Sequence, residues 1–248
     1  MAPSSLVLAG VSVRQHSRAR RLRLRLDPAS GQPVLTAPKR VSRREIESFL
    51  DSSQGWITRQ QEKLGQAVPF APGVLLPLFG DDIELVHVSQ QRGAPVLRAG
   101  QLLVGGQTDF FARRVRDFVK LEASRRFQVM ASELMQVLGV KDRGIKLRDT
   151  RSRWGSCSAS GEIHLSWRLA FAPPDVTRYV IAHEVAHLME LNHSPRFWKL
   201  VNQLVGESSS QRTWLKTQGA GLFRIGVSSP RHGEEFQIDS AAPTRSAL

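Results

Sequence analysis

Three of the chain's seven histidines lie within eleven residues, at His183, His187 and His193, and Glu184 follows the first of them. The stretch HEVAH at 183–187 fits the H-E-x-x-H pattern, which places two histidines one turn apart on one face of a helix. Two imidazoles at that spacing can bind one Zn²⁺ at roughly 2.0–2.1 Å. The glutamate lies about 100° round the helix, close enough to hold a metal-bound water and act as general base. The pattern predicts a hydrolytic site with one zinc ion per chain.

A catalytic zinc usually has three protein ligands and one open position. His193 would point away from the other two histidines if the helix continued, but Asn192 favours a helix end and Ser194-Pro195 favours a new start. His193 then lies in a bend, from which its ring can return to the metal. Glu207 is the rival third ligand, and Cys157 as a fourth ligand would close the site and make it structural. We prefer His193, because the turn signals bracket it.

The elements around this motif can be read from their periodicity. The histidine helix opens at APPDV, with Pro174 in its first turn, and its apolar stripe is that of an ordinary core helix: Val180, Ile181, Val185 and Leu188. A further helix is predicted from Ser194 to about Val205. Two strands, IKLRDTRSRWGSCS and GEIHLSWRLA, precede the histidine helix and are joined by a turn at SASG. A long helix from Thr108, closed by Gly139, comes before both strands.

The first third of the chain has the pattern of a small β-rich unit with one helix. Arginines and leucines alternate over residues 21–26, the period of a half-buried strand. Ser42 with Glu45 forms a capping box, which predicts a helix to about Leu64. The proline-broken stretch AVPFAPGVLLPLFGDD and the strand-like segments IELVHV and PVLRAGQLLV follow. We therefore expect a β-rich unit at 1–105, a metal-dependent hydrolase domain at 106–224 and a disordered tail at 225–248.

Composition limits the class of protein. The chain has 248 residues, of which 41% are hydrophobic, and carries a formal net charge of +13. A single cysteine excludes an internal disulfide, and no apolar run approaches the roughly 18 to 20 residues of a membrane span. We expect a cytoplasmic protein. Residues 1–65 carry 12 Lys and Arg against 5 Asp and Glu, which favours an anionic partner.

Residues 150–201 closely resemble the YgjP-like metallopeptidase domain, a relative of the SprT and WLM zinc peptidases. The resemblance depends on RWGSCS, HEVAH and NHSPRFW in this order, and it extends more loosely over residues 10–222. It implies an α+β, zincin-like domain with an active-site helix and a small mixed or antiparallel sheet, preceded by the β-rich unit. It also implies zinc held by the three histidines named above, with Glu184 as catalytic base.

The same resemblance suggests how a peptide binds. In zincins, a strand at the lip of the cleft pairs with an extended peptide substrate. The candidate substrate-binding residues on such a strand are Arg153, Trp154, Gly155 and Ser156. Trp154 also fits a core anchor, and His164, on the polar face of the next strand, is typical of a surface histidine.

Zinc-dependent hydrolysis of peptide bonds is the leading functional hypothesis, with a peptide or protein substrate. The resemblance also implies a second activity, because nucleotide pyrophosphatases are attributed to the same family, so UTP is a second candidate substrate for the same site. No G-x-x-x-x-G-K-[ST] loop is present, so Arg151 and Arg153 would have to hold the phosphates. The third hypothesis is a nucleic-acid-associated module that uses the basic N-terminal face and binds in a salt-dependent way. A structural zinc protein is the weakest alternative, because Glu184 would then have no catalytic role.

Overall fold

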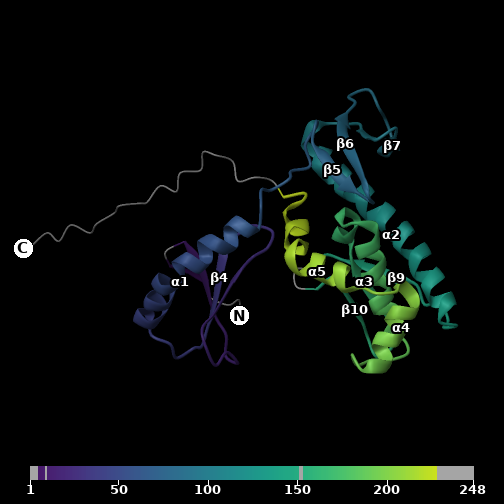
Figure 1. Ribbon diagram of the computed structural model, residues 1–248. Coiled ribbons are helices and arrows are strands. Elements are labelled where there is room, and N and C mark those ends of the chain that lie inside the picture. Colours follow the sequence, from purple (N-terminus) through teal and green to yellow (C-terminus); the bar gives the residue numbers. More distant parts are fainter. Residues whose placement is uncertain (1–4, 9, 151–152, 228–248) are drawn as a thin grey trace, which may run out of the picture.

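The structure is a computed structural model that describes residues 5–8, 10–150 and 153–227, so Arg151 and most of the predicted tail lie outside it. The described chain is a mixed α+β protein, as predicted, with small sheets and helices in two separate units (Figure 1). No helix among the described residues is both long and apolar enough to cross a bilayer.

The N-terminal unit is a four-stranded sheet with one helix. Its elements are β1 (Ser5–Leu8), β2 (Val11–Gln15), β3 (Arg23–Leu26), β4 (Pro33–Ala37) and α1 (Arg43–Lys63), and the strand order is β1-β2-β4-β3. The predicted capping box starts α1: Ser42 Oγ accepts from the Glu45 amide at 3.2 Å, and the Ser42 amide donates to the Glu45 carboxylate at 2.8 Å.

The two faces of this sheet differ in character, because side chains alternate along each strand. Val13, Leu24 and Leu35 lie on the face that packs against α1. The opposite face carries arginines, since Arg14 and Arg23 both pair with Thr36 across the sheet, and Arg25 pairs with Val34 beside them. All three arginines are exposed.

A second four-stranded sheet follows, in the order β5-β6-β8-β7. Its strands are β5 (Leu75–Leu78), β6 (Asp81–His87), β7 (Val96–Arg98) and β8 (Gln101–Val104). One predicted strand is different in the structure, and one strand was not predicted. The strand-like segment PVLRAGQLLV is a hairpin that turns at Ala99 and Gly100, both with positive φ. The proline-broken stretch contains β5, and Pro77 is tolerated because β5 is an edge strand.

The remaining elements surround the histidine helix. In chain order they are η1 (Thr108–Phe110), α2 (Phe111–Val137), β9 (Ile145–Arg148), β10 (Gly155–Cys157), β11 (Ile163–Ser166), η2 (Trp167–Phe171), α3 (Pro174–Ala186), α4 (Pro195–Val205), α5 (Ser209–Thr217) and η3 (Gly219–Arg224). The stretch predicted as one strand over 145–158 is two strands, β9 and β10, on opposite sides of β11. The sequence patterns did not predict α5.

Two hydrophobic clusters divide the described chain. One runs from Leu8 to Ile57, and the other runs from Phe70 to Ile225 and includes the β5–β8 sheet together with α2 and α3. The domain division at residue 105 stays a prediction. The clusters favour a boundary near residues 64–70, because the second sheet buries its apolar face against α2 rather than against the N-terminal unit.

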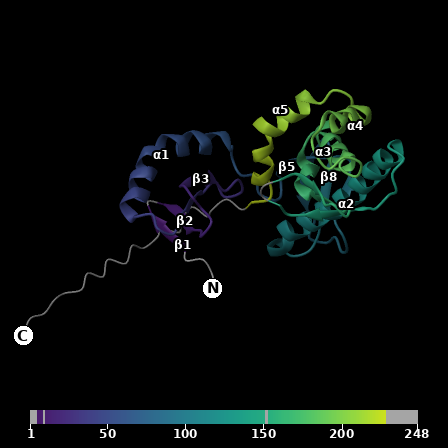
Figure 2. The same cartoon turned by 90° about the horizontal axis from the view of Figure 1, so that it is seen from below.

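The two units meet through the end of the described chain. The Arg224 guanidinium donates to the Ala29 carbonyl at 2.8 Å. Within the larger unit, the neighbouring Ile225 forms a bridge with Val68. Figures 1 and 2 both show α5 and η3 on the side of the larger unit that faces the N-terminal unit.

Candidate active site

The histidine helix is held in the larger core by its apolar residues. Val180, Ile181 and Val185 are buried, so the rest of the α3 surface can carry the polar groups. The helix ends at Ala186, earlier than the expected end near Asn192. The reason is local: the His187 Nδ1 group donates to the Glu190 carbonyl at 2.9 Å, which stabilises a turn directly after the helix.

The segment after this turn starts α4 in another direction. Ser194 caps α4 by accepting a hydrogen bond from the Phe197 amide at 3.3 Å, and Pro195 occupies the first helical position. The Asn192 side chain accepts from the Ser194 amide at 3.1 Å and so shapes the bend that contains His193.

The structure brings the three predicted histidines together. One ligand atom from each of His183, His187 and His193 lies within 4.8 Å of the others, and the His183 and His193 Nε2 atoms are 3.0 Å apart. Two nitrogens bound to one tetrahedral zinc lie roughly 3.3 Å apart, as follows from Zn–N bonds of about 2.0 Å. Since the Nδ1 group of His187 donates to a carbonyl, its Nε2 carries the free lone pair. The donor set fits a zinc ion.

Packing by α4 keeps the histidine rings in place. The ring of Phe197, which is fully buried, lies 4.5 Å from that of His187, 4.8 Å from that of His193 and 4.9 Å from that of His183, between centroids. Burial, together with the charges of the other two histidines, lowers the pKa of His183 to about 4. His183 is therefore neutral near pH 7, the form that binds a metal.

Glu184 lies beside the histidines and against the backbone of β10. It is only 6% exposed, and burial raises its pKa to about 7, while the charge of Arg153 acts in the opposite direction. A Cβ atom at Gly155 would lie 2.5 Å from both Cγ and Oε1 of Glu184. A glycine at this position is what allows the carboxyl group to approach the strand.

The predicted substrate-binding residues lie at the edge of the three-stranded sheet. The order β10-β11-β9 makes β10 an edge strand, with its pairing to β11 on one side. Arg153 is exposed, and Trp154, Gly155 and Ser156 are half-buried. The Trp154 ring stacks on Phe223, with ring centroids 4.7 Å apart.

A cavity of about 200 Å³ adjoins His183 and Glu184 and reveals two residues that were not predicted from the sequence. Tyr179 and Leu215 line it together with Trp154, His183 and Glu184. Tyr179 is one helical turn before His183, so the i, i+4 spacing could have indicated it. Nothing in the sequence around Leu215 indicates its place here, because α5 brings it from far along the chain.

The rival ligands do not join the histidines. Among the His, Cys, Asp and Glu side chains of the described residues, one group brings its ligand atoms together, and it consists of His183, His187 and His193. The Glu207 carboxylate instead accepts from the Ser209 amide and hydroxyl, at 3.0 and 2.6 Å. Cys157 is half-buried on β10, where burial, with a smaller contribution from Glu184, raises the pKa of its thiol.

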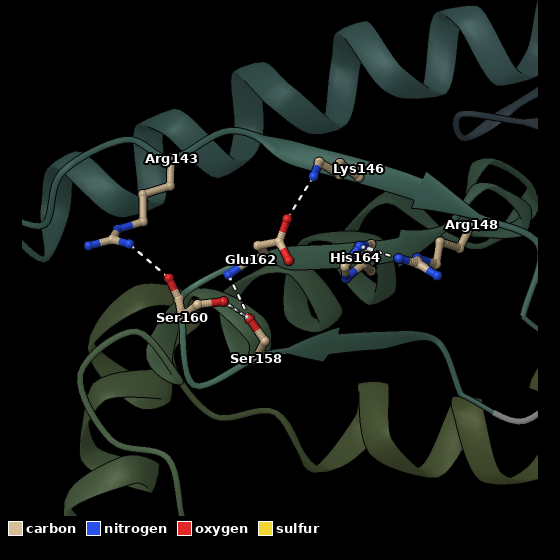
Figure 3. A network of polar contacts seen from close by, with 7 residues as sticks. All are labelled: Arg143, Lys146, Arg148, Ser158, Ser160, Glu162 and His164. Carbon is tan, nitrogen blue, oxygen red and sulfur yellow. Dashed lines mark hydrogen bonds and ion pairs between the residues drawn. The ribbon is translucent and has the colours of Figure 1, made fainter.

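His164 belongs to a different network, on β9 and β11 (Figure 3). The Arg148 guanidinium donates to its Nε2 atom at 2.9 Å, and burial with the Arg148 charge lowers its pKa. In the same network Lys146 pairs with Glu162 at 2.7 Å. His164 thus has a local partner away from the histidine cluster.

Comparison with known proteins places the chain in a family. A structure search finds the metallopeptidase zymogen of Pyrococcus abyssi abylysin, which is 21% identical over 37% of this chain and 95% of its own, with a TM-score of 0.33. A similarity this low adds no argument about the site. No curated protein matches. The family model described as YgjP-like, metallopeptidase domain, matches residues 20–218. The chain therefore belongs to the YgjP-like family of metallopeptidases.

Proposed function

We propose that this metallopeptidase uses one zinc ion, held by His183, His187 and His193, and Glu184 as its general base. The observation that carries the proposal is the convergence of three histidine nitrogens within 4.8 Å, beside a buried glutamate. A structural zinc site is usually closed by four protein ligands, whereas a catalytic one keeps a position open. Three ligands beside a carboxylate favour the catalytic kind.

The metal and the glutamate have separate roles in this proposal. When bound, zinc supplies Lewis-acid chemistry, which polarises a carbonyl and lowers the pKa of a water molecule. Glu184 takes the proton from the attacking water and passes it to the leaving amine. A carboxylate whose pKa is about 7 suits both transfers, because a general base works best when its pKa is near the working pH.

We assign the peptide to the edge strand β10. An extended peptide can add to the free edge of a sheet through main-chain hydrogen bonds. Because the Glu184 carboxyl lies against Gly155, a peptide on this edge has its backbone next to the base. Arg153, Trp154 and Ser156 then flank the bound peptide.

The first test is metal content. We expect about one zinc per purified chain by mass spectrometry, and a loss of most of it in His193→Ala. His164→Ala is the matched control, because His164 is a histidine of the same domain outside the cluster, and it should keep its zinc. Full zinc in His193→Ala would move the third ligand to Glu207 or Cys157.

The second test separates chemistry from metal binding. In Glu184→Gln we expect zinc to stay and peptide cleavage to fall about 10²- to 10⁴-fold, the usual contribution of a general base. Cleavage at the wild-type rate would reject Glu184 as the base. Hydrolysis of UTP by the same preparations, in place of peptide cleavage, would favour the nucleotide pyrophosphatase alternative.

A further inference from the structure

The cavity beside β10 shares two lining residues with a larger cavity between the two units. The larger one has a volume of about 620 Å³ and is lined by Arg14 and Arg25 from the N-terminal sheet and by Arg153 from the larger unit. Trp154 and Leu215 line both this cavity and the one that contains His183 and Glu184. The two cavities are therefore adjacent at Trp154 and Leu215.

The three guanidinium groups are available to a ligand. Arg14 and Arg25 project from the sheet face opposite α1, and neither they nor Arg153 form an ion pair with another residue in the described part of the chain. One acid, Asp27, also lines the cavity, but it is buried, and its Oδ1 atom accepts hydrogen bonds from the Ala29 and Ser30 amides. The cavity thus has an excess of positive charge.

Close packing builds the part of this cavity that contains Trp154. Trp154 stacks on Phe223 with an interplanar angle of 27°, and a Cβ atom at Gly219 would come within 3.3 Å of its ring. The Arg224 side chain holds the N-terminal unit at Ala29, two residues after Asp27. The arginines of the two units can therefore contact the same ligand when it lies against Trp154.

We propose that this cavity binds acidic side chains of the peptide substrate, so that the enzyme prefers peptides with glutamate or aspartate beside the cleaved bond. The proposal rests on the proposed peptidase function. Arginine pairs with carboxylates through two parallel hydrogen bonds, which gives both charge and geometry. A volume of about 620 Å³ is typical of pockets that bind small ligands. The cavity can therefore hold a few side chains but not a nucleic-acid duplex.

The test compares two double variants with the same loss of charge. Arg14→Gln/Arg25→Gln removes the two cavity arginines of the N-terminal sheet and leaves Arg153. Arg44→Gln/Arg59→Gln removes two exposed arginines of α1, on the other face of the same sheet. The substrates are two fluorogenic peptides that differ only in glutamates versus glutamines around the cleaved bond. We expect the ratio of kcat/KM, glutamate over glutamine peptide, to fall about tenfold in the first variant, as two partly solvated ion pairs would give, and to stay unchanged in the second.

Binding provides a readout that does not depend on cleavage. In a Glu184→Gln background, the labelled glutamate peptide should bind more weakly to the cavity variant than to the α1 variant. Equal effects of both variants, or no effect of either, would overturn the proposal, even where peptide cleavage itself stands. Loss of binding of a labelled DNA duplex, with peptide binding unchanged, would overturn the proposal and assign Arg14 and Arg25 to a nucleic-acid surface instead. Absence of cleavage by every variant would refute the peptidase mechanism and leave the binding result valid.

Discussion

The histidine cluster and the arginine-lined cavity are neighbours that are built in different ways. The cluster comes from eleven consecutive residues, His183 to His193, and its base is buried. The cavity takes its arginines from positions 14, 25 and 153, all exposed, and exists only because two units pack together. The first region is specified by local spacing and burial, and the second by the arrangement of distant segments. The two should therefore respond differently to substitution, unfolding and salt.

Removal of the metal should have the largest effect, and it should be confined to the first region. Treatment with a chelator should reduce cleavage of both the glutamate and the glutamine peptide to background, and added zinc should restore it, because the proposed ion supplies the main electrophile. Anisotropy of the labelled glutamate peptide should still show binding to the arginine cavity. Full cleavage in a preparation whose zinc has been removed would contradict the zinc mechanism.

Gly155→Ala should have the next largest effect. The new methyl group would meet the Glu184 carboxyl at 2.5 Å, and a displacement of about 1 Å in a catalytic group costs about a hundredfold in rate. We expect kcat/KM to fall about a hundredfold for both peptides, while mass spectrometry finds the zinc content unchanged.

Gly221→Ala is the matched control for that substitution. A Cβ atom at Gly221 would have nothing within 4 Å, so this variant should keep its activity. Equal activity of the two alanine variants would mean that the carboxyl group does not need its place against β10.

Removing one helix cap from each unit should show whether the two hydrophobic cores unfold independently. Ser42 caps α1 and Ser194 caps α4, and each accepts a hydrogen bond from a backbone amide. Loss of such a cap costs about 1 kcal/mol. Because α1 and α4 belong to different hydrophobic clusters, hydrogen exchange should speed up in α1 only for Ser42→Ala, and in α4 only for Ser194→Ala.

Zinc affinity is a second measurement that distinguishes the two cap variants. Ser194→Ala should also weaken zinc binding, since Ser194 follows His193 directly, while Ser42→Ala should leave it unchanged. Exchange that rises in both helices for either variant would show that the two units unfold together.

Local signals in the sequence predicted where α1 and α4 begin, but they missed α5 and placed the end of α3 too late. The capping box at Ser42 and the Ser194-Pro195 start were placed correctly, because a cap depends on residues three apart. The segments that failed depend on partners far along the chain. One predicted strand is divided between β9 and β10, since both pair with β11, and the break of PVLRAGQLLV at Ala99 carries only a single glycine, Gly100, as a turn signal.

The candidate site shows the same limit. Spacing alone was enough to propose the three histidines and Glu184, whose catalytic roles stay predictions. It could not show that Leu215 lines their cavity or that Phe223 supports Trp154, because both residues arrive on later elements. The basic N-terminal strand predicts an anionic partner, and that stays a prediction. Which face of the sheet adjoins β10 depends on how the units pack.

Salt should have the smallest effect, and it should act only on the second region. Exposed charges are screened over about 10 Å at 0.1 M salt and about 3 Å at 1 M, so contacts made by Arg14 and Arg25 should weaken as salt rises. The buried Glu184 is protected from such screening. We expect kcat/KM for the glutamate peptide to fall roughly threefold between low and high salt, the scale of an exposed ion pair, and kcat/KM for the glutamine peptide to change little. If both peptides lost the same factor, the salt would be acting on the catalytic centre itself, and the preference for acidic peptides would have to come from buried contacts rather than from the exposed arginines.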